Sequence, residues 1–465
     1  MIRTSTNDNF ETVENPSSTL DTIQNNPIKV PQITEEELLA ILYEEIVPAE
    51  GCTEPIALAY SAAKALEILN DRVEELTQVK IHASGNIIKN VKSVVIPNSG
   101  GAIGIPVAVA LGLVAGKPEL ELMVISHVTE MHRKKMNTLL DTIPFDLIHE
   151  QTEAKLYIKI ELISHNHSAS VEIKHLHTNI TQIIKDGKVI LQQPCNDADC
   201  NSPLKDREKL SIWSIYQIAH QIDLKKIAPL FEEVIKKNKA IAEEGLKGIY
   251  GVNIGQFITE SIENGFYGND VRNRAAAFAS AGSDARMSGC PLPVMTTSGS
   301  GNQGMTASLP VIAYAAANSI SKDKLIRALF FSHAATIHIK TNVGRLSAYC
   351  GVICAAAAVS GALCILKDDS FDKVAHAIMN TLGSISGIIC DGAKASCAMK
   401  IATSIYAAFD GAILAIGGRY LHGGDGIIAN EIEETLNNIG RLSQQGMQYT
   451  DDVIIDIMCQ NKEKK

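Results

Sequence analysis

The sequence predicts an α+β protein in which a large Ala- and Gly-rich helical domain is combined with a smaller α/β domain of mixed sheet. From Leu210 onward the chain consists almost entirely of long alanine-rich runs interrupted by glycines, a pattern typical of closely packed helices. Between residues 76 and 205, short β-branched segments often alternate with polar residues, as in strands. Aromatic residues make up only 5% of the chain, which argues against an aromatic-rich sandwich.

Composition excludes several classes of protein. The 465 residues are 46% hydrophobic, so the chain can bury a large core. Lys and Arg number 42 against 52 Asp and Glu, and a net charge of −10 is a poor match for nucleic acid. The segment MIRTSTNDNFETVENPSSTL has no apolar signal core. We therefore expect a cytoplasmic protein whose ten cysteines are reduced thiols, with reactive or metal-binding roles for those that matter.

The pattern divides the chain into four segments. We expect a disordered tail, two N-terminal helices that join the helical domain, an α/β domain inserted after them, and the main helical domain, at residues 1–33, 34–75, 76–205 and 206–460. Order begins sharply at Thr34, because Thr34 and Glu37 form a capping-box pattern and Ile33 with Leu38 fits the matching hydrophobic staple.

The elements of the α/β segment follow from their periodicity. A helix is expected over IPVAVALGLVAG (105–116). Strands are expected over VKIHAS (79–84), VKSVVI (91–96), LELMVISHV (120–128), LYIKIELIS (156–164) and ASVEIKHL (169–176).

One stretch is long and apolar enough to cross a membrane. Residues 347–366 carry no charge over twenty positions. Six of these residues are alanines, which contribute little to insertion, and no aromatic belt flanks the stretch. We expect a buried central helix and no membrane partner.

Cys52 is the first candidate for chemistry. It lies in GCTEP (51–55), directly before a helix in which a proline near the first position marks the start. Free N–H groups at a helix start favour an anion and lower the pKa of a thiol, so Cys52 is a candidate thiolate base or nucleophile. The alternative is a small buried residue at a tight helix corner.

Cys350, Cys390 and Cys397 form a second candidate set. On an unbroken helix, seven residues would separate Cys390 from Cys397 by about 10.5 Å. Asp391-Gly392 is a turn signal, so a break there would bring the two sulfurs together. Cys354, one turn after Cys350, is the residue most easily confused with a ligand. All four could instead be small apolar core residues.

A hydroxyl- and glycine-rich loop opens the helix that begins near residue 301. Backbone N–H groups at such a helix start bind carboxylate or phosphate, and the loop consists of Ser298, Gly299, Ser300, Gly301, Asn302 and Gln303. Asn86 lies in a similar but weaker loop, and Lys340 is a candidate contact for a substrate carboxylate. We expect the metal-like spacing of Cys195 and Cys200 to reflect exposed inert thiols, and His333 and His338 to be structural.

Several of these pieces occur together in one known family. GCTEP (51–55), SGNIIKN (84–90), GSGNQGM (299–305), KTN…AYCG (340–351) and CDGAKASC (390–397) follow one another in an order and spacing that resemble the L-cysteine desulfidase family. That family is related to the alpha subunits of oxygen-sensitive iron–sulfur L-serine dehydratases. The resemblance extends over residues 34–458.

The resemblance implies a site and a reaction. Three cysteines of the family hold a [4Fe-4S] cluster with one open iron in the helical domain, and they map onto Cys350, Cys390 and Cys397. The proposed catalytic cysteine maps onto Cys52. The implied reaction is β-elimination of L-cysteine to pyruvate, ammonia and sulfide, with the iron as Lewis acid and the substrate carboxylate on the Ser298–Gly304 loop.

Other functions stay open on the sequence. L-serine dehydration would use the same scaffold. A pyridoxal-dependent β-eliminase would explain SGSGNQG, although no Schiff-base lysine is identifiable. An iron–sulfur sensor without turnover would need a DNA-binding module, and no basic helix-turn-helix is visible. The expected partner is a small-molecule amino acid, and a homodimer is compatible with all of these functions.

Overall fold

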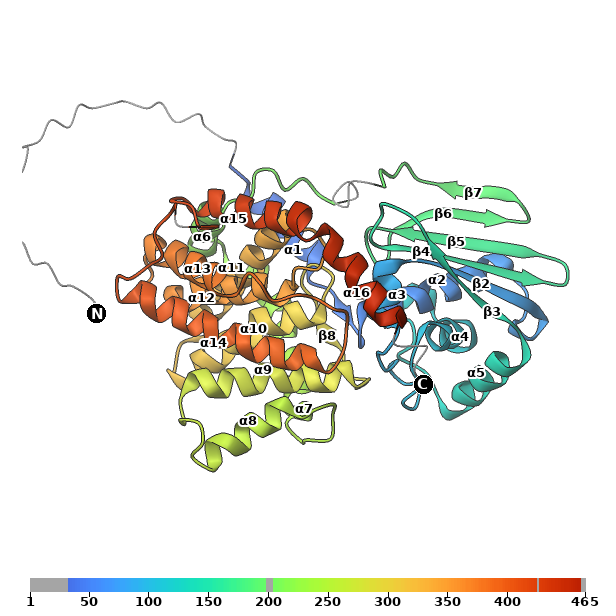
Figure 1. Cartoon of the computed structure of the whole chain (residues 1–465), viewed down its shortest axis with the longest axis horizontal. Coiled ribbons are helices and arrows are strands. Elements are labelled where there is room, and N and C mark those ends of the chain that lie inside the picture. Colours follow the sequence, from blue (N-terminus) through green and yellow to red (C-terminus); the bar gives the residue numbers. More distant parts are fainter. Residues whose placement is uncertain (1–31, 198–203, 425, 461–465) are drawn as a thin grey trace, which may run out of the picture.

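The computed structural model describes residues 32–197, 204–424 and 426–460 and consists of two lobes that lie side by side (Figure 1). One lobe is helical, and the other combines a six-stranded mixed sheet with helices. The α+β class predicted from the sequence is therefore confirmed. The predicted tail lies almost wholly outside the described residues.

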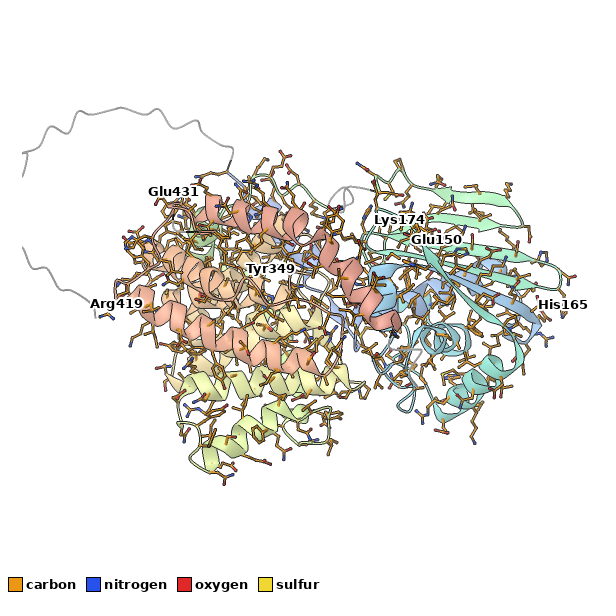
Figure 2. All side chains as sticks on the ribbon, in the orientation of Figure 1. Glu150, His165, Lys174, Tyr349, Arg419 and Glu431 are labelled. Atoms are coloured by element: carbon orange, nitrogen blue, oxygen red, sulfur yellow. The ribbon has the colours of Figure 1, made fainter. Side chains whose placement is uncertain are left out.

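The helical lobe is built around α12 (Gly351–Lys367), which packs against α10, α11, α13 and α14. All residues from Val352 to Leu366 are buried, so the uncharged stretch is the central helix that the sequence predicts. Tyr349, which is 1% exposed, lies in the interior of this lobe (Figure 2). The surrounding helices are α1 (Glu35–Glu45), α6 (Ile212–Gln221), α7 (Leu224–Gly245), α8 (Ile254–Glu263), α9 (Val271–Met287), α10 (Gly301–Ala317), α11 (Lys322–Val343), α13 (Phe371–Ile385), α14 (Ser396–Ile416) and α15 (Ile432–Arg441).

A different helix of this lobe, α14, has the length and apolar composition of a membrane span. Only half of its most apolar window is buried, and it packs against α9, α12 and α13. Helix α1 begins with the predicted capping box, in which Thr34 and Glu37 each accept a hydrogen bond from the other's backbone N–H.

The second lobe contains a sheet in the order β3-β2-β4-β5-β6-β7. Strands β2 and β3 are parallel and the other pairs are antiparallel. On β4, Ile158, Ile160 and Leu162 are buried, whereas the residues between them are partly exposed. One face therefore packs on α2, as alternation requires. The strands are β2 (Leu76–Ser84), β3 (Phe145–Glu150), β4 (Tyr157–Ser164), β5 (Ser168–Lys174), β6 (Ile180–Lys185) and β7 (Lys188–Gln192).

Two predicted strands are wrong. Residues 91–96 leave α3 (Gly85–Val91) and run through a turn. Residues 120–128 begin inside the 3-10 helix Pro118–Met123 and continue into a turn. Val94, Ile96, Val124 and Ile125 are nonetheless buried. The apolar residues of these two stretches therefore pack into the core of the second lobe from irregular backbone. The sequence analysis also missed β6 and the edge strands β3 and β7. An edge strand with exposed side chains has no burial pattern to detect.

Residues 34–75, expected to join the helical domain, are shared between the lobes, and α1 packs in the helical lobe. Helix α2 (Thr53–Leu69) packs against α4 (Ile105–Ala115) and the sheet, in the core of the second lobe. Gly112 of α4 permits this contact, because a Cβ there would lie 2.2 Å from the carbonyl oxygen of Ala59. An apolar alanine-rich helix does not itself specify its packing partner. Helix α5 (Glu130–Thr142) completes this lobe.

Two pairings of secondary-structure elements help to join the lobes. Strand β1 (Pro48–Ala49) pairs with β8 (Val294–Met295) of the helical lobe. Helix α16 (Gln448–Gln460) crosses the boundary and packs on α3 (Figure 1). There the Lys89 ammonium lies 2.5 Å from a carboxylate oxygen of Asp451. These contacts hold the loop that carries Cys390 against α3.

The α2–α4 contact generates a stability prediction. Gly112→Ala should lower the free energy of unfolding by about 2 kcal/mol or more, because the methyl group meets backbone atoms that cannot rotate away. Gly387→Ala is the matched control, since a Cβ there meets nothing within 4 Å and its φ is ordinary. Thermal and urea unfolding of both variants measure the difference, and equal melting temperatures would contradict it.

Candidate functional site

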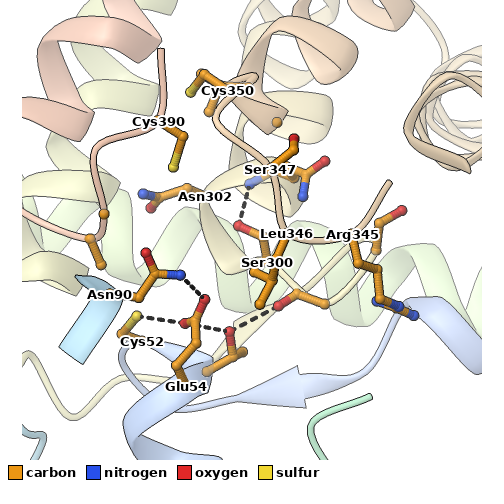
Figure 3. Close-up of a pocket in the computed structure, with 18 of the residues that line it drawn as sticks. Cys52, Glu54, Asn90, Ser300, Asn302, Arg345, Leu346, Ser347, Cys350 and Cys390 are labelled. Carbon is orange, nitrogen blue, oxygen red and sulfur yellow. Dashed lines mark hydrogen bonds between the residues drawn. The ribbon is translucent and has the colours of Figure 1, made fainter. Parts of the chain in front are cut away.

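A pocket lies at the boundary of the two lobes (Figure 3). About 880 Å³ of space lies among its lining residues, open solvent at the mouth included. Four long helices begin at its wall, because Cys52, Ser300 and Cys350 are the N-caps of α2, α10 and α12, and Cys397 lies in the first turn of α14. The positive ends of these helix dipoles face the space and favour an anion.

The structure brings most of the predicted site residues together here. All three cysteines of the second set line the pocket with Cys52, although up to 345 positions separate them in the chain. Five residues of the hydroxyl-rich loop, together with Asn86 and Lys340, line it as well. These seven are Asn86, Ser298, Gly299, Ser300, Asn302, Gln303 and Lys340. Gly301 does not line the pocket, because the side chain of Arg286 packs against its backbone.

The backbone places Cys350 and Cys390 next to each other. Cys390 N–H donates to the carbonyl of Ala348 at 2.6 Å, and Cys350 N–H donates to the carbonyl of Ile388 at 3.2 Å. Gly392 then turns the chain with a φ of +100°, and a Cβ there would lie 2.7 Å from the carbonyl oxygen of Lys89. Helix α14 starts only after this turn, so both Cys390 and Cys397 reach the pocket.

These thiols are free, and the surroundings of Cys350 and Cys397 oppose ionisation. Burial raises the pKa of Cys350, and the neighbouring Cys390 raises it further. Burial also raises the pKa of Cys397 and lowers that of the Lys340 ammonium. Cys354 is buried in α12 and does not line the pocket. Three soft sulfur donors facing one space fit a metal group that stabilises thiolates, such as an iron–sulfur cluster.

The separation of the three thiols also fits a cluster better than one ion. Within the described residues, the group of three ligands whose donor atoms all lie within 4.8 Å of one another is His175, Cys195 and Asp197. The three pocket cysteines are not that close. A cluster gives each thiolate its own iron and so spans a wider triangle than a single ion. The His175 group lies outside the pocket, and Lys174 already pairs with Asp197 at 2.9 Å. Cys200 is outside the described residues.

On the side of the pocket opposite Cys350 and Cys390, Cys52 forms a pair with Glu54 (Figure 3). The Cys52 thiol donates to the Glu54 carboxylate at 2.9 Å, and that carboxylate also accepts from Thr53 and Asn90. Burial and the negative charge of Glu54 raise the pKa of Cys52 well above its ordinary value. The expectation that the helix start favours a thiolate is therefore wrong for this state, because burial and Glu54 outweigh the helix dipole.

Glu54 itself is held ionised. Burial alone would raise its pKa, but the charge of His177, the hydrogen bond from Cys52 and the charge of Arg286 together lower it. The proton of the pair therefore lies on sulfur, and the carboxylate is the group able to accept it.

The hydroxyl-rich loop presents polar atoms without partners. Ser298 and Gly299 have positive φ values of 50° and 75°, and the Thr53 hydroxyl fixes the loop by donating to the Gly299 carbonyl at 2.9 Å. Among the described residues, nothing hydrogen-bonds to the buried Ser298 Oγ, Asn302 Oδ1 or Gln303 Oε1. Buried polar atoms of this kind are normally satisfied, so the loop is built for a ligand.

The two candidate histidines lie elsewhere. His333 Nδ1 is 2.7 Å from the Thr297 hydroxyl behind the loop, and His338 Nε2 is 2.7 Å from Glu433. Neither lines the pocket, and their contacts are structural.

Sequence reasoning missed several residues of the pocket. Glu54 was within reach, because it stands two positions after Cys52 in GCTEP. Arg286 was the one cation in residues 275–287, the alanine-, glycine- and serine-rich part of α9, which is itself a signal. Lys89 and Asn90 lie in the SGNIIKN motif but were not selected as site residues, and His177 gave no local signal. The docking of the second lobe brings all three to the pocket.

The Cys52–Glu54 pair predicts a change in thiol reactivity. Because the charge of Glu54 raises the pKa of Cys52, Glu54→Gln should lower that pKa and increase alkylation of Cys52 at pH 8 by roughly tenfold per pKa unit. Iodoacetamide labelling with peptide mapping measures the rate from pH 6 to 10. Glu50→Gln is the control, since Glu50 is a buried carboxyl that does not contact Cys52. Unchanged labelling in Glu54→Gln would refute the coupling.

Comparison with known proteins identifies the family to which this chain belongs. The chain is similar to UPF0597 proteins of Fusobacterium nucleatum subsp. nucleatum, at 58% identity over 91% of this chain and 98% of the relative, and of Desulfitobacterium hafniense, at 44% over 90% and 96%. A third, from Lachnoclostridium phytofermentans, is 42% identical over 91% and 99%. The family model described as serine dehydratase alpha chain matches residues 64–456. The chain therefore belongs to the serine dehydratase alpha chain family, a family of lyases.

Proposed function

We propose that this protein is a cytoplasmic lyase that eliminates sulfide from L-cysteine, giving pyruvate and ammonia, with a [4Fe-4S] cluster held by Cys350, Cys390 and Cys397. The observation that carries the proposal is the convergence of three free thiols, the Cys52–Glu54 pair and the unpartnered polar loop on one pocket. The resemblance of GCTEP, GSGNQGM and CDGAKASC to the L-cysteine desulfidase family supports it.

The ligand set suits this cofactor. Besides Cys52, the cysteines that line the described pocket are Cys350, Cys390 and Cys397, and a set of three ligands would leave one iron of the cluster for substrate. When bound, the cluster supplies a Lewis acid that polarises the bond to the leaving group.

The residues of the chain bind the amino acid and move its proton. The loop from Ser298 to Gly304 receives the carboxylate at the positive end of α10. Glu54 takes the proton of Cys52, and the resulting thiolate removes the α-proton of the substrate. The electron pair of the C–H bond forms the new double bond as sulfide leaves. The enamine product then tautomerises and hydrolyses to pyruvate and ammonia.

L-Serine dehydration is the second candidate, and the description of the matching family favours it. The same residues would serve, with hydroxide as the leaving group. Pyruvate formation from L-cysteine and from L-serine, compared on one anaerobic preparation, distinguishes the two. A catalytic efficiency at least tenfold higher for L-cysteine supports the desulfidase, and the reverse ratio supports the dehydratase.

Reconstitution tests the cluster. Anaerobic reconstitution should give a brown protein with about four iron and four sulfide per chain that bleaches in air. Ala substitution of Cys350, Cys390 or Cys397 should abolish the colour. Cys354→Ala is the matched control and should keep it, because that thiol does not reach the pocket. A colourless wild-type protein, or equal losses in all four variants, would contradict the assignment.

A further test concerns Cys52. Cys52→Ala should keep the iron and the colour and lower turnover by roughly 10²–10⁴-fold, which is the usual contribution of a general base. Cys52→Ser should be almost as slow, since a hydroxyl ionises far less readily than a thiol. Iron analysis and anaerobic kinetics measure both effects. Loss of iron would make Cys52 a cluster ligand, and activity within a few-fold of wild type would assign the base elsewhere.

A further inference from the structure

Arg286 is an unpaired cation in the pocket wall. It lies at the end of α9 and is only 2% exposed. Its Nε is buried without a hydrogen-bond partner, and no carboxylate of the described residues lies within ion-pair distance of its guanidinium. Arg345, which also lines the pocket, differs because it pairs with the buried Glu45 at 2.7 Å. A buried guanidinium without such a partner is costly, so a ligand is the group able to complete it.

The groups around Arg286 indicate the chemical class of ligand that would bind there. A Cβ at Gly301 would lie 2.4 Å from Nε and 2.9 Å from Cζ of Arg286, so the missing side chain lets the guanidinium reach the first turn of α10. The hydroxyl of Ser298, 5% exposed and unpartnered, belongs to the same loop. A guanidinium, a helix start and a hydroxyl are all donors, and together they match a carboxylate.

Glu54 does not neutralise Arg286 in place of a ligand. Its charge interacts with the guanidinium, yet its oxygens are already engaged by Cys52, Thr53 and Asn90. The pocket also presents unpartnered acceptors, namely Asn90 Oδ1, Asn302 Oδ1 and Gln303 Oε1, on residues at most 8% exposed. Acceptors of this kind suit an ammonium group.

We propose that Arg286, the start of α10 and the Ser298 hydroxyl form the subsite for the α-carboxylate of an amino-acid substrate. The amide oxygens of Asn90 and Asn302 receive its ammonium. The pocket therefore selects zwitterionic α-amino acids over amines and esters. This inference rests on the proposed function and names the residue that fixes the orientation of the substrate.

Two ligands that differ only in the carboxylate test the subsite. In anaerobic kinetics with L-cysteine, Arg286→Gln should raise KM by roughly 10–100-fold, which is the range for a lost charge-assisted hydrogen bond, and change kcat less. Cysteamine, which lacks the carboxylate, should inhibit wild type and Arg286→Gln with inhibition constants within about twofold of each other. Arg286→Lys should recover part of the KM, because it restores the charge without the planar fork.

Controls separate this inference from the proposed function. Arg274→Gln, on the exposed side of the same helix, should behave as wild type. Calorimetric binding of L-cysteine and cysteamine needs no turnover, so weaker L-cysteine binding in Arg286→Gln would uphold the subsite even if no pyruvate forms. Equal weakening of both ligands would show a collapsed pocket and overturn the inference. Unchanged L-cysteine binding in Arg286→Gln would overturn it as well.

Discussion

The buried ion pair between Lys89 and Asp451 fixes the geometry on which the pocket depends. The side chain of Lys89 is 1% exposed and that of Asp451 is 7% exposed, so neither charge is solvated and each requires the other. The same ammonium donates to the carbonyl of Cys390 at 3.3 Å. One cation thus ties α3 of the sheet lobe, α16 and the cysteine loop together. Neighbouring Lys92 adds a contact to the carbonyl of Met458.

Near this ion pair, the site combines groups that disfavour negative charge with groups that favour it. Burial raises the pKa of Cys52, Cys350 and Cys397 and so disfavours their thiolates. The helix starts and Arg286 favour negative charge in the same space. A pocket that disfavours thiolates yet attracts anions is suited to a ligand that is itself negatively charged. Small residues make this possible, because Gly301 and Gly392 let a guanidinium and a backbone carbonyl approach where a side chain would block them.

Local sequence patterns were sufficient for part of this structure. The capping box at Thr34, the central helix after Cys350 and the turn at Asp391-Gly392 each depend on residues close in the chain, and the structure contains all three. The strands expected at 91–96 and 120–128 are absent, because alternating apolar residues can be buried without a partner strand. The edge strands were missed for the converse reason, because a strand that pairs without burying one face has no alternation of apolar and polar residues.

The residues of the site also fall into those that local motifs predicted and those that only the tertiary structure revealed. Motifs identified the cysteines and the loop because each carries unusual residues at short spacing. The contribution of Arg286 depends on what is missing around it, namely a carboxylate within reach, and only tertiary structure reveals an absence of that kind. The partnership of Cys52 with Glu54 likewise reverses the electrostatics expected from the helix start alone.

The position of the pocket between two lobes couples occupancy to domain docking. Its wall takes Asn86 and His177 from one lobe and Arg286 and Cys350 from the other, so a ligand that touches all of them binds only the docked arrangement. By mass action, such a ligand at a hundred times its Kd stabilises that arrangement by about 2.7 kcal/mol. A ligand of this kind stabilises the contact between the lobes, and the short β1–β8 ladder and α16 supply part of the remaining stability.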